Sequence, residues 1–404
     1  MASRPRLLVL SSTYPRFRDD PEPAFVHELS RRLTPDFDVY VLCPHAPGTL
    51  ASEQMDGVQI RRFRYAPERL ETLVQGGGIV NNLKHQPWKW LLVPPFMAAL
   101  TWHTARLIRH LKPDVVHAHW IVPQGLALLL ARPLVQRLPP FVLTSHGGDL
   151  FGLRGAIATR LKRWVLGKAD ATTVVSRPMA ATATSLGADP RRLAIIPMGV
   201  DFHERFTPGA IRDRTPGEIL FVGRLVEKKG LRYLVEAMPR VIARVPHAHL
   251  TIAGYGPEET ALRQLVATQG VGDKVTFLGA LPQHTLPDLY RRAAVFVAPF
   301  VRADSGDQEG LPVALTEAIA CGCPAVVGDL PALDDLLEPS DANLRVSPRD
   351  SSALAAAVIT VLRDPGASAR RASALRARLA ERLDWDVIAR RYAGLLAELA
   401  AHVR

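Results

Sequence analysis

The chain has 404 residues, of which 48% are hydrophobic and 22% are charged, and its formal net charge is +11. This length exceeds what one compact core holds and predicts two domains of about 200 residues, while the apolar content argues against an intrinsically disordered chain. The positive charge suggests an anionic partner, but no basic helix, zinc-ligand spacing or aromatic RNA-binding motif accompanies it, which argues against nucleic acid. An anionic bilayer surface and a merely solvated Arg-rich surface remain as alternative explanations.

The amino terminus and the cysteines indicate the compartment. The apolar run at residues 7–10 is too short for a signal peptide and predicts a first β-strand. No stretch of eighteen uncharged apolar residues follows, so we expect no transmembrane helix. Cys43, Cys321 and Cys323 suit neither a disulfide framework nor a metal site and predict packed, reduced thiols. We therefore expect a cytoplasmic protein, either free or peripheral at the cytoplasmic face of a membrane.

Short β-rich runs alternate with helix-like stretches along the first half of the chain. The stretches 25–33 and 124–138 are amphipathic or rich in Ala and Leu. Such alternation predicts βαβ units around a parallel sheet. The predicted strands cover residues 7–10, 39–42, 115–116, 141–144 and 171–175.

Residues 70–92 differ from this pattern. They hold consecutive glycines at 76–78, followed by Trp88, Lys89 and Trp90. Glycines beside an aromatic and basic stretch predict a mobile acceptor loop or a membrane-facing edge. The alternative is that these side chains are core on one side of a helix that starts near Pro95. If the segment meets a bilayer, the basic residues expected to contribute are Arg61, Arg62, Arg64, Lys84, Lys89, Arg106 and Arg109.

The second half of the chain repeats the alternation and predicts a second doubly wound domain. The polar segment 201–217, rich in Gly and Pro, is the best linker. After about Asp350 the strands stop, and two Ala- and Arg-rich helices are expected to run to the end, punctuated by Pro365, Gly366 and Asp384. The predicted strands of this half cover residues 219–222, 249–253, 275–277, 295–297 and 325–327.

A cluster of cations follows the predicted strand 219–222. After Gly223 the loop carries Arg224, Lys228 and Lys229, and a helix is expected next. Open parallel sheets bind ligands beyond the carboxyl ends of their strands, and both Arg and Lys suit phosphate oxygens. Alternatively, the three cations are merely solvated and bind no phosphate. For Lys228 in particular, the alternative is that its side chain faces water.

Two glutamates, Glu309 and Glu317, have seven residues between them. Pro312 suits the first turn of a helix and Gly322 its end, so Glu309 is expected in the loop before this helix and Glu317 about one turn inside it. Free N–H groups at a helix start attract phosphate, and carboxylates accept hydrogen bonds from sugar hydroxyls. The pattern predicts a nucleotide-sugar site, although two glutamates at this spacing are common on solvated helices.

Taken together, the two clusters resemble the retaining glycosyltransferases of the GT-B fold, specifically the large family 4. In that family Val-Gly-Arg-Leu (here 222–225), Lys-Gly (229–230) and Glu-x7-Glu (309–317) occur in this order. The segments 113–120, 143–149 and 196–201 look like the family's inner strand, active-site histidine and interdomain hinge. The resemblance covers essentially the whole chain.

This resemblance implies an α/β architecture of two Rossmann-like, doubly wound parallel-sheet domains that face a central cleft. Residues 1–205 would form the acceptor-side domain and residues 206–383 the nucleotide-sugar-binding domain. The last helix, 384–404, would pack back on the first domain.

The same resemblance implies the roles of individual residues. Arg224 and Lys229 would stabilise the leaving diphosphate, Glu309 would contact donor-sugar hydroxyls, and Glu317 the ribose. His146 would lie near the C6 side of the sugar and the acceptor, oriented by Asp149, whereas lone histidines such as His117 and His119 are usually structural. The implied catalytic residues are His146, Arg224, Lys229 and Glu309. The implied donor-binding residues are Arg224, Lys229, Gly223, Leu281, Glu309, Gly310, Leu311, Pro312, Val313 and Glu317. The implied acceptor-side residues are Phe25, His119, His146 and Asp149.

Three departures from the family pattern affect details of the site. Met198 stands where the hinge usually has Asn, and the loop at residues 14–29 lacks the usual Gly-Gly pair. Glu-Gly-Leu-Pro at 309–312 replaces the commoner Glu-Gly-Phe-Gly. The transferred sugar and the acceptor therefore stay open.

The function that follows is retaining transfer of a hexose from a UDP- or GDP-linked donor to a glycan, a glycolipid or a small molecule, without a metal ion or other cofactor. No covalent nucleophile is evident, and the resemblance implies same-face attack assisted by the departing phosphate. One alternative is an epimerase or phosphorylase of the same fold, which the order of the motifs disfavours. Another is a non-catalytic basic protein that binds membrane or nucleic acid, which fold alone does not exclude but both charged clusters argue against.

Overall fold

The computed structural model describes residues 4–17, 20, 24–75, 78–347 and 349–401. The chain divides into two compact units: unit 1 comprises Met1–Gly199 and Trp385–Arg404, and unit 2 comprises Val200–Asp384. The sequence predicts domain boundaries at 205/206 and 383/384. Because unit 2 begins at Val200, the segment 201–217, the predicted linker, belongs to unit 2. Gly76, Gly77 and residues 21–23 of the amino-terminal loop lie outside the described residues.

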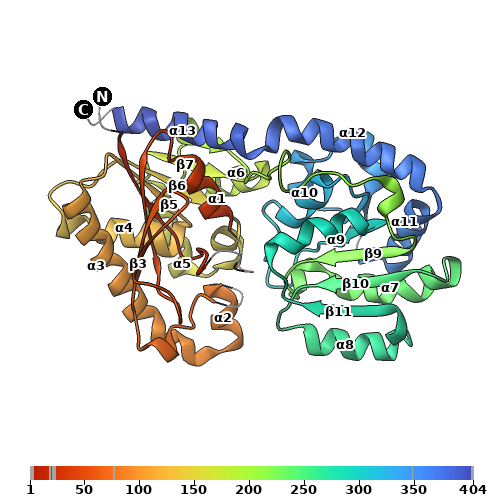
Figure 1. The fold of residues 1–404 in the computed structure, drawn as a ribbon. Coiled ribbons are helices and arrows are strands. Elements are labelled where there is room, and N and C mark those ends of the chain that lie inside the picture. The colour runs from red at the N-terminus through yellow and green to blue at the C-terminus, as the bar shows by residue number, and fades with distance from the viewer. Residues whose placement is uncertain (1–3, 18–19, 21–23, 76–77, 348, 402–404) are drawn as a thin grey trace. The chain divides into compact units, whose positions relative to one another are not determined.

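Unit 1 is built on one mostly parallel sheet (Figure 1). Its strand order is β3-β4-β2-β1-β5-β6-β7-β8, and among the described strands only β3 pairs antiparallel, with β4. The described strands of this unit are β1 (Arg6–Leu10), β2 (Asp38–Pro44), β3 (Ser52–Met55), β4 (Val58–Phe63), β5 (Val115–His119), β6 (Phe141–Ser145), β7 (Ala171–Val174) and β8 (Leu193–Ile195).

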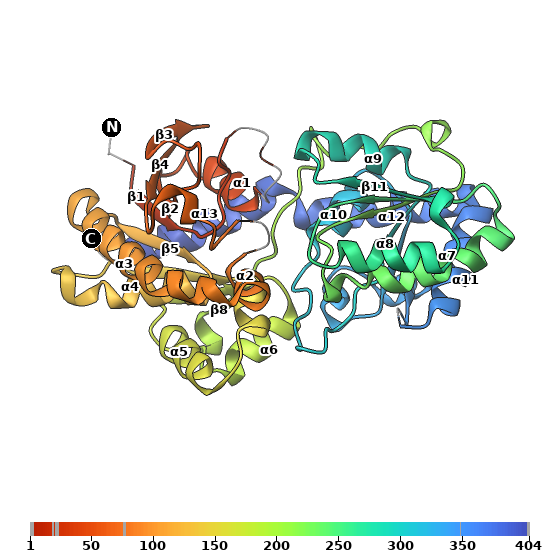
Figure 2. The same ribbon diagram turned by 90° about the horizontal axis from the view of Figure 1, so that it is seen from below.

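Helices cover both faces of this sheet, as Figure 2 shows. The predicted helix over 124–138 is wrong beyond its middle: the α-helix covers Leu126–Leu130, and a separate 3-10 turn, Arg132–Leu134, follows it with Pro133 as its second residue. The helix α13 at the end of the chain packs against α1 and β5, and its Tyr392 hydroxyl lies 3.2 Å from Thr173 Oγ1. The helices of unit 1 are α1 (Phe25–Arg32), α2 (Ile79–His85), α3 (Val93–Leu111), α4 (Leu126–Leu130), α5 (Ala156–Leu166), α6 (Arg177–Ser185) and α13 (Trp385–Ala401), with the 3-10 segment η2 (Pro87–Leu92) between α2 and α3.

Unit 2 has a second, fully parallel sheet with the order β11-β10-β9-β12-β13-β14. Where the sequence predicts two helices after Asp350, the structure has three, because Asp364 caps a new helix through Ala367 N–H as Asp350 caps the one before it. The strands are β9 (Glu218–Val222), β10 (His249–Ala253), β11 (Val275–Gly279), β12 (Val295–Ala298), β13 (Ala325–Gly328) and β14 (Arg345–Val346). The helices are α7 (Leu231–Arg244), α8 (Glu259–Thr268), α9 (Leu286–Arg292), α10 (Val313–Ala320), α11 (Ser351–Arg363) and α12 (Pro365–Leu383).

The central strands of unit 2 are buried on both faces. Ile219 and Phe221 of β9 belong to one apolar cluster, with α7, α8 and α11. Leu220, between them, belongs to the other cluster, together with Phe296 of β12 and Ile319 of α10. Because side chains alternate along a strand, a run without polar residues fits a sheet covered by helices on both sides. This is the doubly wound arrangement that the sequence predicts.

The strand order reverses once in each sheet. In unit 1 the chain leaves β1 toward β2 on one side and later adds β5 on the other, and in unit 2 the same happens at β9, between β10 and β12. At such a switch point the loops beyond the carboxyl ends of the strands diverge and leave room for a ligand. The loops after β1, β5, β9 and β12 are therefore the candidate ligand sites.

Two further expectations concern the whole chain. Among the described residues, no helix is both long enough and apolar enough to cross a bilayer. Cys43, Cys321 and Cys323 are buried and unpaired, which confirms the prediction of packed thiols. Burial raises the pKa of Cys43 and Cys321 to about 12.

Candidate active site

The loop after β9 is held against its neighbours by backbone hydrogen bonds. Gly223 N–H donates to Ala253 O at 3.0 Å, and Val301 N–H, from the loop after β12, donates to Lys228 O at 3.0 Å. Gly230 closes the loop with φ +67°, and a Cβ there would lie 1.9 Å from Pro299 O. Only glycine fits such a close approach, so the Lys-Gly pair fixes the loop after β9 onto the loop after β12.

Two lysines of this loop converge on Glu309. Lys229 Nζ lies 3.1 Å from Glu309 Oε2, and Lys228 Nζ lies 3.5 Å from Glu309 Oε1 and 3.3 Å from Asp307 Oδ1. The structure thus joins the two clusters that are about eighty residues apart in the sequence, at the switch point of unit 2. The alternative that Lys228 faces water is wrong, because only 13% of its side chain is exposed.

The charges at this point determine the ionisation of Glu309. Burial alone would raise the pKa of Glu309, but Lys229, Lys228 and Arg224 together lower it to about 2. Burial also lowers the pKa of Lys229, and Glu309 opposes that effect. Glu309 Oε1 is buried and accepts no hydrogen bond from the residues that the structure describes. An ionised carboxylate oxygen with spare acceptor capacity is suited to a hydroxyl donor.

The helix α10 begins just after Glu309. Pro312 is its N-cap rather than part of its first turn, and Glu317 is the fifth residue of the helix. The first N–H groups of any helix lack partners inside it and form an anion site. Gly310 and Leu311 connect Glu309 to this helix start, and Val313 is its first residue, so the predicted donor-binding segment is continuous in space.

Glu317 has a partner that the sequence did not reveal. Its Oε2 accepts a hydrogen bond of 3.0 Å from the hydroxyl of Tyr290, a fully buried residue of α9. Burial raises the pKa of Glu317 to about 7, although the Tyr290 hydrogen bond opposes the shift. From sequence alone, a tyrosine at helical spacing is interpreted as a core residue like Phe. The sequence therefore does not reveal that its hydroxyl hydrogen-bonds to Glu317.

The remaining donor-side predictions lie on the same edge of the sheet. Gly223 and Arg224 follow β9 directly, and Arg224 is close enough to contribute to the lowered pKa of Glu309. Leu281 follows β11 and packs, partly buried, against the apolar cluster that contains Leu286. The structure therefore brings the donor-side residues of unit 2 to the carboxyl ends of β9, β11 and β12.

In unit 1 the corresponding edge carries a cluster of aromatic rings. His119 ends β5 and His146 follows β6, and the register of these parallel strands brings their rings together. His119 Nδ1 lies 2.9 Å from His146 Nε2, with the two rings nearly parallel. The rings of Phe25 and Trp120 lie 4.8 and 5.0 Å from that of His146. Three of the predicted acceptor-side residues, Phe25, His119 and His146, are thus in contact.

The expected role of Asp149 in orienting His146 is wrong. Asp149 is buried and accepts hydrogen bonds from Ile121 N–H at 2.7 Å and from Ser145 Oγ at 2.8 Å. It therefore fixes the loops after β5 and β6, and the ring nitrogen of His146 is instead bonded to His119. The sequence missed this pairing because His119 and His146 are 27 residues apart and meet only through the strand register.

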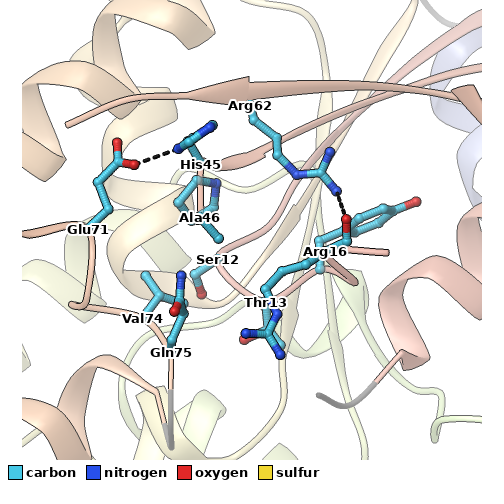
Figure 3. Close-up of a pocket in the computed structure, with 11 residues that line it drawn as sticks. Ser12, Thr13, Arg16, His45, Ala46, Arg62, Glu71, Val74 and Gln75 are labelled. Carbon is cyan, nitrogen blue, oxygen red and sulfur yellow. Dashed lines mark hydrogen bonds and ion pairs between the residues drawn. The ribbon is translucent and has the colours of Figure 1, made fainter. Parts of the chain in front are cut away.

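A small polar pocket lies beyond the carboxyl ends of β1 and β2 (Figure 3). Its walls include His45 and Glu71, whose Nδ1 and Oε2 are 2.5 Å apart, and Arg62, which donates to Pro15 O at 2.7 Å. The cavity of about 30 Å³ is the size of a water molecule and too small for a sugar ring. The sequence did not single out this cluster, and it shows that Arg62 is buried and unable to meet a bilayer, contrary to expectation.

Comparison with known families covers both units. The family described as Glycosyltransferase Family 4 matches residues 24–204, and the family described as Glycosyl transferases group 1 matches residues 216–364. Among curated relatives, the chain is 33% identical to a glycogen synthase of Mycobacterium tuberculosis over 288 residues, 70% of this chain and 68% of that one. It is 30% identical to a GDP-mannose-dependent alpha-(1-6)-phosphatidylinositol monomannoside mannosyltransferase of the same organism over 281 residues, 67% of this chain and 73% of that one.

Solved structures share the fold. Sucrose-phosphate synthase from Thermosynechococcus elongatus matches with a TM-score of 0.80 at 21% identity and covers 99% of this chain and all of its own. Anabaena Alr3699/HepE, solved in complex with UDP and glucose, matches with a TM-score of 0.72 at 16% identity over 98% of this chain and all of its own. These likenesses confirm two parallel-sheet α/β domains of the GT-B type, and the sequence matches show that the chain belongs to the group 1, family 4 glycosyltransferases.

Proposed function

We propose that the chain is a retaining hexosyltransferase that moves a hexose from a UDP- or GDP-linked donor to a hydroxyl of a glycan or lipid-linked acceptor. The observation that carries the proposal is the convergence of Lys229 and Lys228 on Glu309 at the switch point of unit 2. A single buried carboxylate with two cations next to a helix start offers sites for both a diphosphate and a sugar hydroxyl.

The donor diphosphate would bind the cations and the start of α10. Arg224, Lys228 and Lys229 lie on one loop, and the first N–H groups of α10 carry the positive end of the helix dipole. When the anomeric C–O bond breaks, negative charge grows on the leaving diphosphate, so fixed positive groups stabilise the transition state more than the ground state. These side chains can perform that task without a metal ion.

The two glutamates would hold the two sugars of the donor. Glu309 Oε1 is buried and accepts no hydrogen bond from the described residues, although Lys228 Nζ lies 3.5 Å away, so it would be available to a hydroxyl of the transferred hexose. Glu317 has one oxygen on Tyr290, and its other oxygen would take the ribose hydroxyls. Glu309 would then act on the reacting sugar and Glu317 on binding of the nucleotide.

Unit 1 would supply the acceptor side. Burial keeps His146 neutral, with its pKa lowered to about 3, so it serves as a hydrogen-bond partner rather than as a cation. The rings of Phe25 and Trp120 beside it offer apolar faces of the kind on which sugars pack. In the reaction the acceptor oxygen forms the new bond to the anomeric carbon, and its proton goes to the departing phosphate oxygen on the same face of the sugar.

The names of the relatives agree with a hexose donor, since one is a glycogen synthase and another depends on GDP-mannose. The test is incubation with a panel of UDP- and GDP-hexoses in the presence of oligosaccharide and lipid-linked acceptors. Release of nucleoside diphosphate with a glycosylated product of the donor's own anomeric configuration, read by NMR, supports the proposal.

Other products would overturn it. Epimerised nucleotide sugar would indicate an epimerase, and an inverted anomeric centre would contradict retention. Nucleotide binding without turnover on any acceptor of the panel would favour a non-catalytic protein. The Glu309→Gln variant serves as the matched negative control, because its side chain keeps the size of Glu309 and loses its charge.

A further inference from the structure

Three exposed tryptophans lie on neighbouring segments of unit 1. The exposed fractions are 47% for Trp88, 57% for Trp90 and 53% for Trp102, and Leu91 is 78% exposed. The first two tryptophans and Leu91 belong to η2, which contacts both α2 and α3, and Trp102 belongs to α3. Figure 2 shows α2 and α3 along one side of unit 1. We call this set, with Lys84, Arg106 and Arg109, the aromatic-basic surface.

Within η2 the usual distribution of side chains is inverted. Lys89 stands between the two exposed tryptophans, yet it is only 4% exposed. Its Nζ donates to Thr72 O at 2.8 Å and to Asn82 Oδ1 at 3.1 Å, which ties η2 to α2. The expectation that Lys89 meets a bilayer is therefore wrong. The buried Lys89 ammonium holds the segment in place while the two large apolar rings face outward. Burial of apolar rings and exposure of a charged lysine is the commoner arrangement in proteins.

The stripe continues along α3. Its exposed positions Ala98, Trp102, Arg106 and Arg109 recur every three or four residues and so share one face, while Leu100 and others on the opposite side are buried. This face is apolar near the start of the helix and basic toward its end. The Arg109 guanidinium lies 5.7 Å from the centre of the Trp102 ring, so the two parts of the stripe are in contact.

The charge of this region has one sign. Although the chain has 39 acidic residues, none occurs in residues 72–113, between Glu71 and Asp114. Lys84, Arg106, Arg109 and Lys112 are all exposed there. A surface that combines outward tryptophans with cations and no anions is complementary to the headgroup region of an anionic bilayer, where indole rings prefer to lie.

We propose that unit 1 docks on anionic lipid bilayers through the aromatic-basic surface. A second copy of the chain is a poorer occupant, because a two-fold contact would place the same cations against each other. The proposal concerns a surface distant in sequence from the donor-site residues, and it does not depend on which sugar is transferred. Docking would give the enzyme access to a lipid-linked acceptor at the membrane surface.

The test is co-sedimentation of the full chain with two kinds of vesicle, one of phosphatidylcholine alone and one containing phosphatidylglycerol. Binding to the anionic vesicles is expected to fall as salt rises, because surface charges are screened over about 10 Å at 0.1 M ionic strength. Each of Lys84→Gln, Arg106→Gln and Arg109→Gln is expected to weaken binding about fivefold at low salt. The triple variant Trp88→Ser, Trp90→Ser, Leu91→Ser is expected to abolish the part of the binding that persists at high salt.

The helix α5 offers matched controls in the same unit. Arg160→Gln with Arg163→Gln removes two exposed cations at the same spacing as Arg106 and Arg109, and Trp164→Ser removes another exposed tryptophan. These changes are expected to leave vesicle binding within about twofold of the wild type. If net charge alone drove vesicle binding, the α5 variants would lose as much binding as the α3 variants. Affinity for UDP and GDP, measured on every variant, reports whether the fold is intact and stays unchanged.

Four outcomes would overturn the proposal. The first is that the wild type does not pellet with anionic vesicles at low salt. The second is that the α5 variants weaken vesicle binding as much as the α3 variants do. The third is that the protein binds heparin through Arg106 and Arg109 but does not bind vesicles. The fourth is that sedimentation velocity shows a dimer that the changes at Trp88 and Trp90 dissociate. Each outcome is independent of glycosyl transfer, so failure here leaves the proposed activity standing.

Discussion

His119 Nδ1 and His146 Nε2 lie 2.9 Å apart in unit 1, with their ring planes 8° from parallel. Burial lowers the pKa of both residues, that of His146 to about 3, so both rings are neutral near neutral pH. Two neutral imidazoles share one hydrogen bond only if one nitrogen donates and the other accepts. The tautomers of His119 and His146 are therefore coupled, and we assign His119 as a positioning residue for His146.

We predict that His119→Phe lowers turnover with the acceptor by about tenfold to 100-fold, as expected for a lost buried hydrogen bond of about 1–3 kcal/mol. His119→Asn, whose amide can occupy the place of Nδ1, is expected to restore part of the rate. Steady-state kinetics with varied acceptor checks this, and the affinity for UDP or GDP is expected to stay constant. If Phe and Asn variants turned over equally fast, His119 would have no positioning role.

With the proposed role of Glu317, its raised pKa would make nucleotide binding depend on pH. If the ionised carboxylate holds the ribose, the affinity for nucleoside diphosphate should rise with pH. Since the fraction ionised grows from about one tenth at pH 6 to about nine tenths at pH 8, the gain expected is about tenfold. Calorimetry across this range measures it. In Glu317→Gln the gain should vanish, and the remaining slope reports the titration of the nucleotide's own phosphate.

The same group links stability to pH. Its pKa is about 7 in the folded chain and 4.5 when unfolded, so between these values the folded state binds more protons. The free energy of unfolding contributed by Glu317 is thus greatest at low pH and is lost as pH rises from 4.5 through 7, by about 3 kcal/mol. Thermal unfolding of wild type and Glu317→Gln should diverge over this range, with the variant becoming relatively more stable at pH 8. Parallel curves would show that Glu317 ionises normally.

We predict that turnover survives EDTA. Arg224, Lys228 and Lys229 would provide the positive charge that a divalent ion brings to the diphosphate in other enzymes. Rates with and without the chelator, followed by addition of magnesium or manganese, give the measurement. A rate that disappears with EDTA and returns only with one of these ions would show that the cations of the loop do not suffice.

The sequence predicted the fold, and it placed the motifs of the proposed donor side at one edge of a sheet, because both inferences rest on local patterns. The β-rich runs at 219–222 and 295–297 correspond to β9 and β12, and the Lys-Gly and Glu-x7-Glu motifs lie at their carboxyl ends. Parallel sheets place such ends together whatever the sequence between them, so motifs eighty residues apart could be assigned to one edge.

What the sequence did not predict depends on side-chain direction and strand register. Trp-Lys-Trp at 88–90 does not tell which residue faces the interior, and the choice follows from the hydrogen bonds of Lys89 with Thr72 and Asn82. Arg62 is buried by contacts with Pro15 and Glu53 that come from other segments. The partners of Glu317 and His146 were missed for the same reason, because Tyr290 and His119 each lie 27 residues away.

Lys229 and Glu309, the two partners of one ion pair in unit 2, have different roles in the proposed reaction. Lys229→Ala is expected to weaken UDP and GDP binding about tenfold to 100-fold, because it removes a charge that would face the diphosphate. Glu309→Gln is expected to bind both nucleotides at least as tightly as the wild type, since it removes an anion from the site, while losing most of its turnover with the sugar nucleotide.

Calorimetric titration of UDP and GDP into wild type, Lys229→Ala and Glu309→Gln is the most direct test of this division. Lys274→Ala, at a half-buried position between α8 and β11, serves as a charge-matched control and should behave as the wild type. We predict weak nucleotide binding in Lys229→Ala alone. Equal loss of affinity in Lys229→Ala and Glu309→Gln would contradict it.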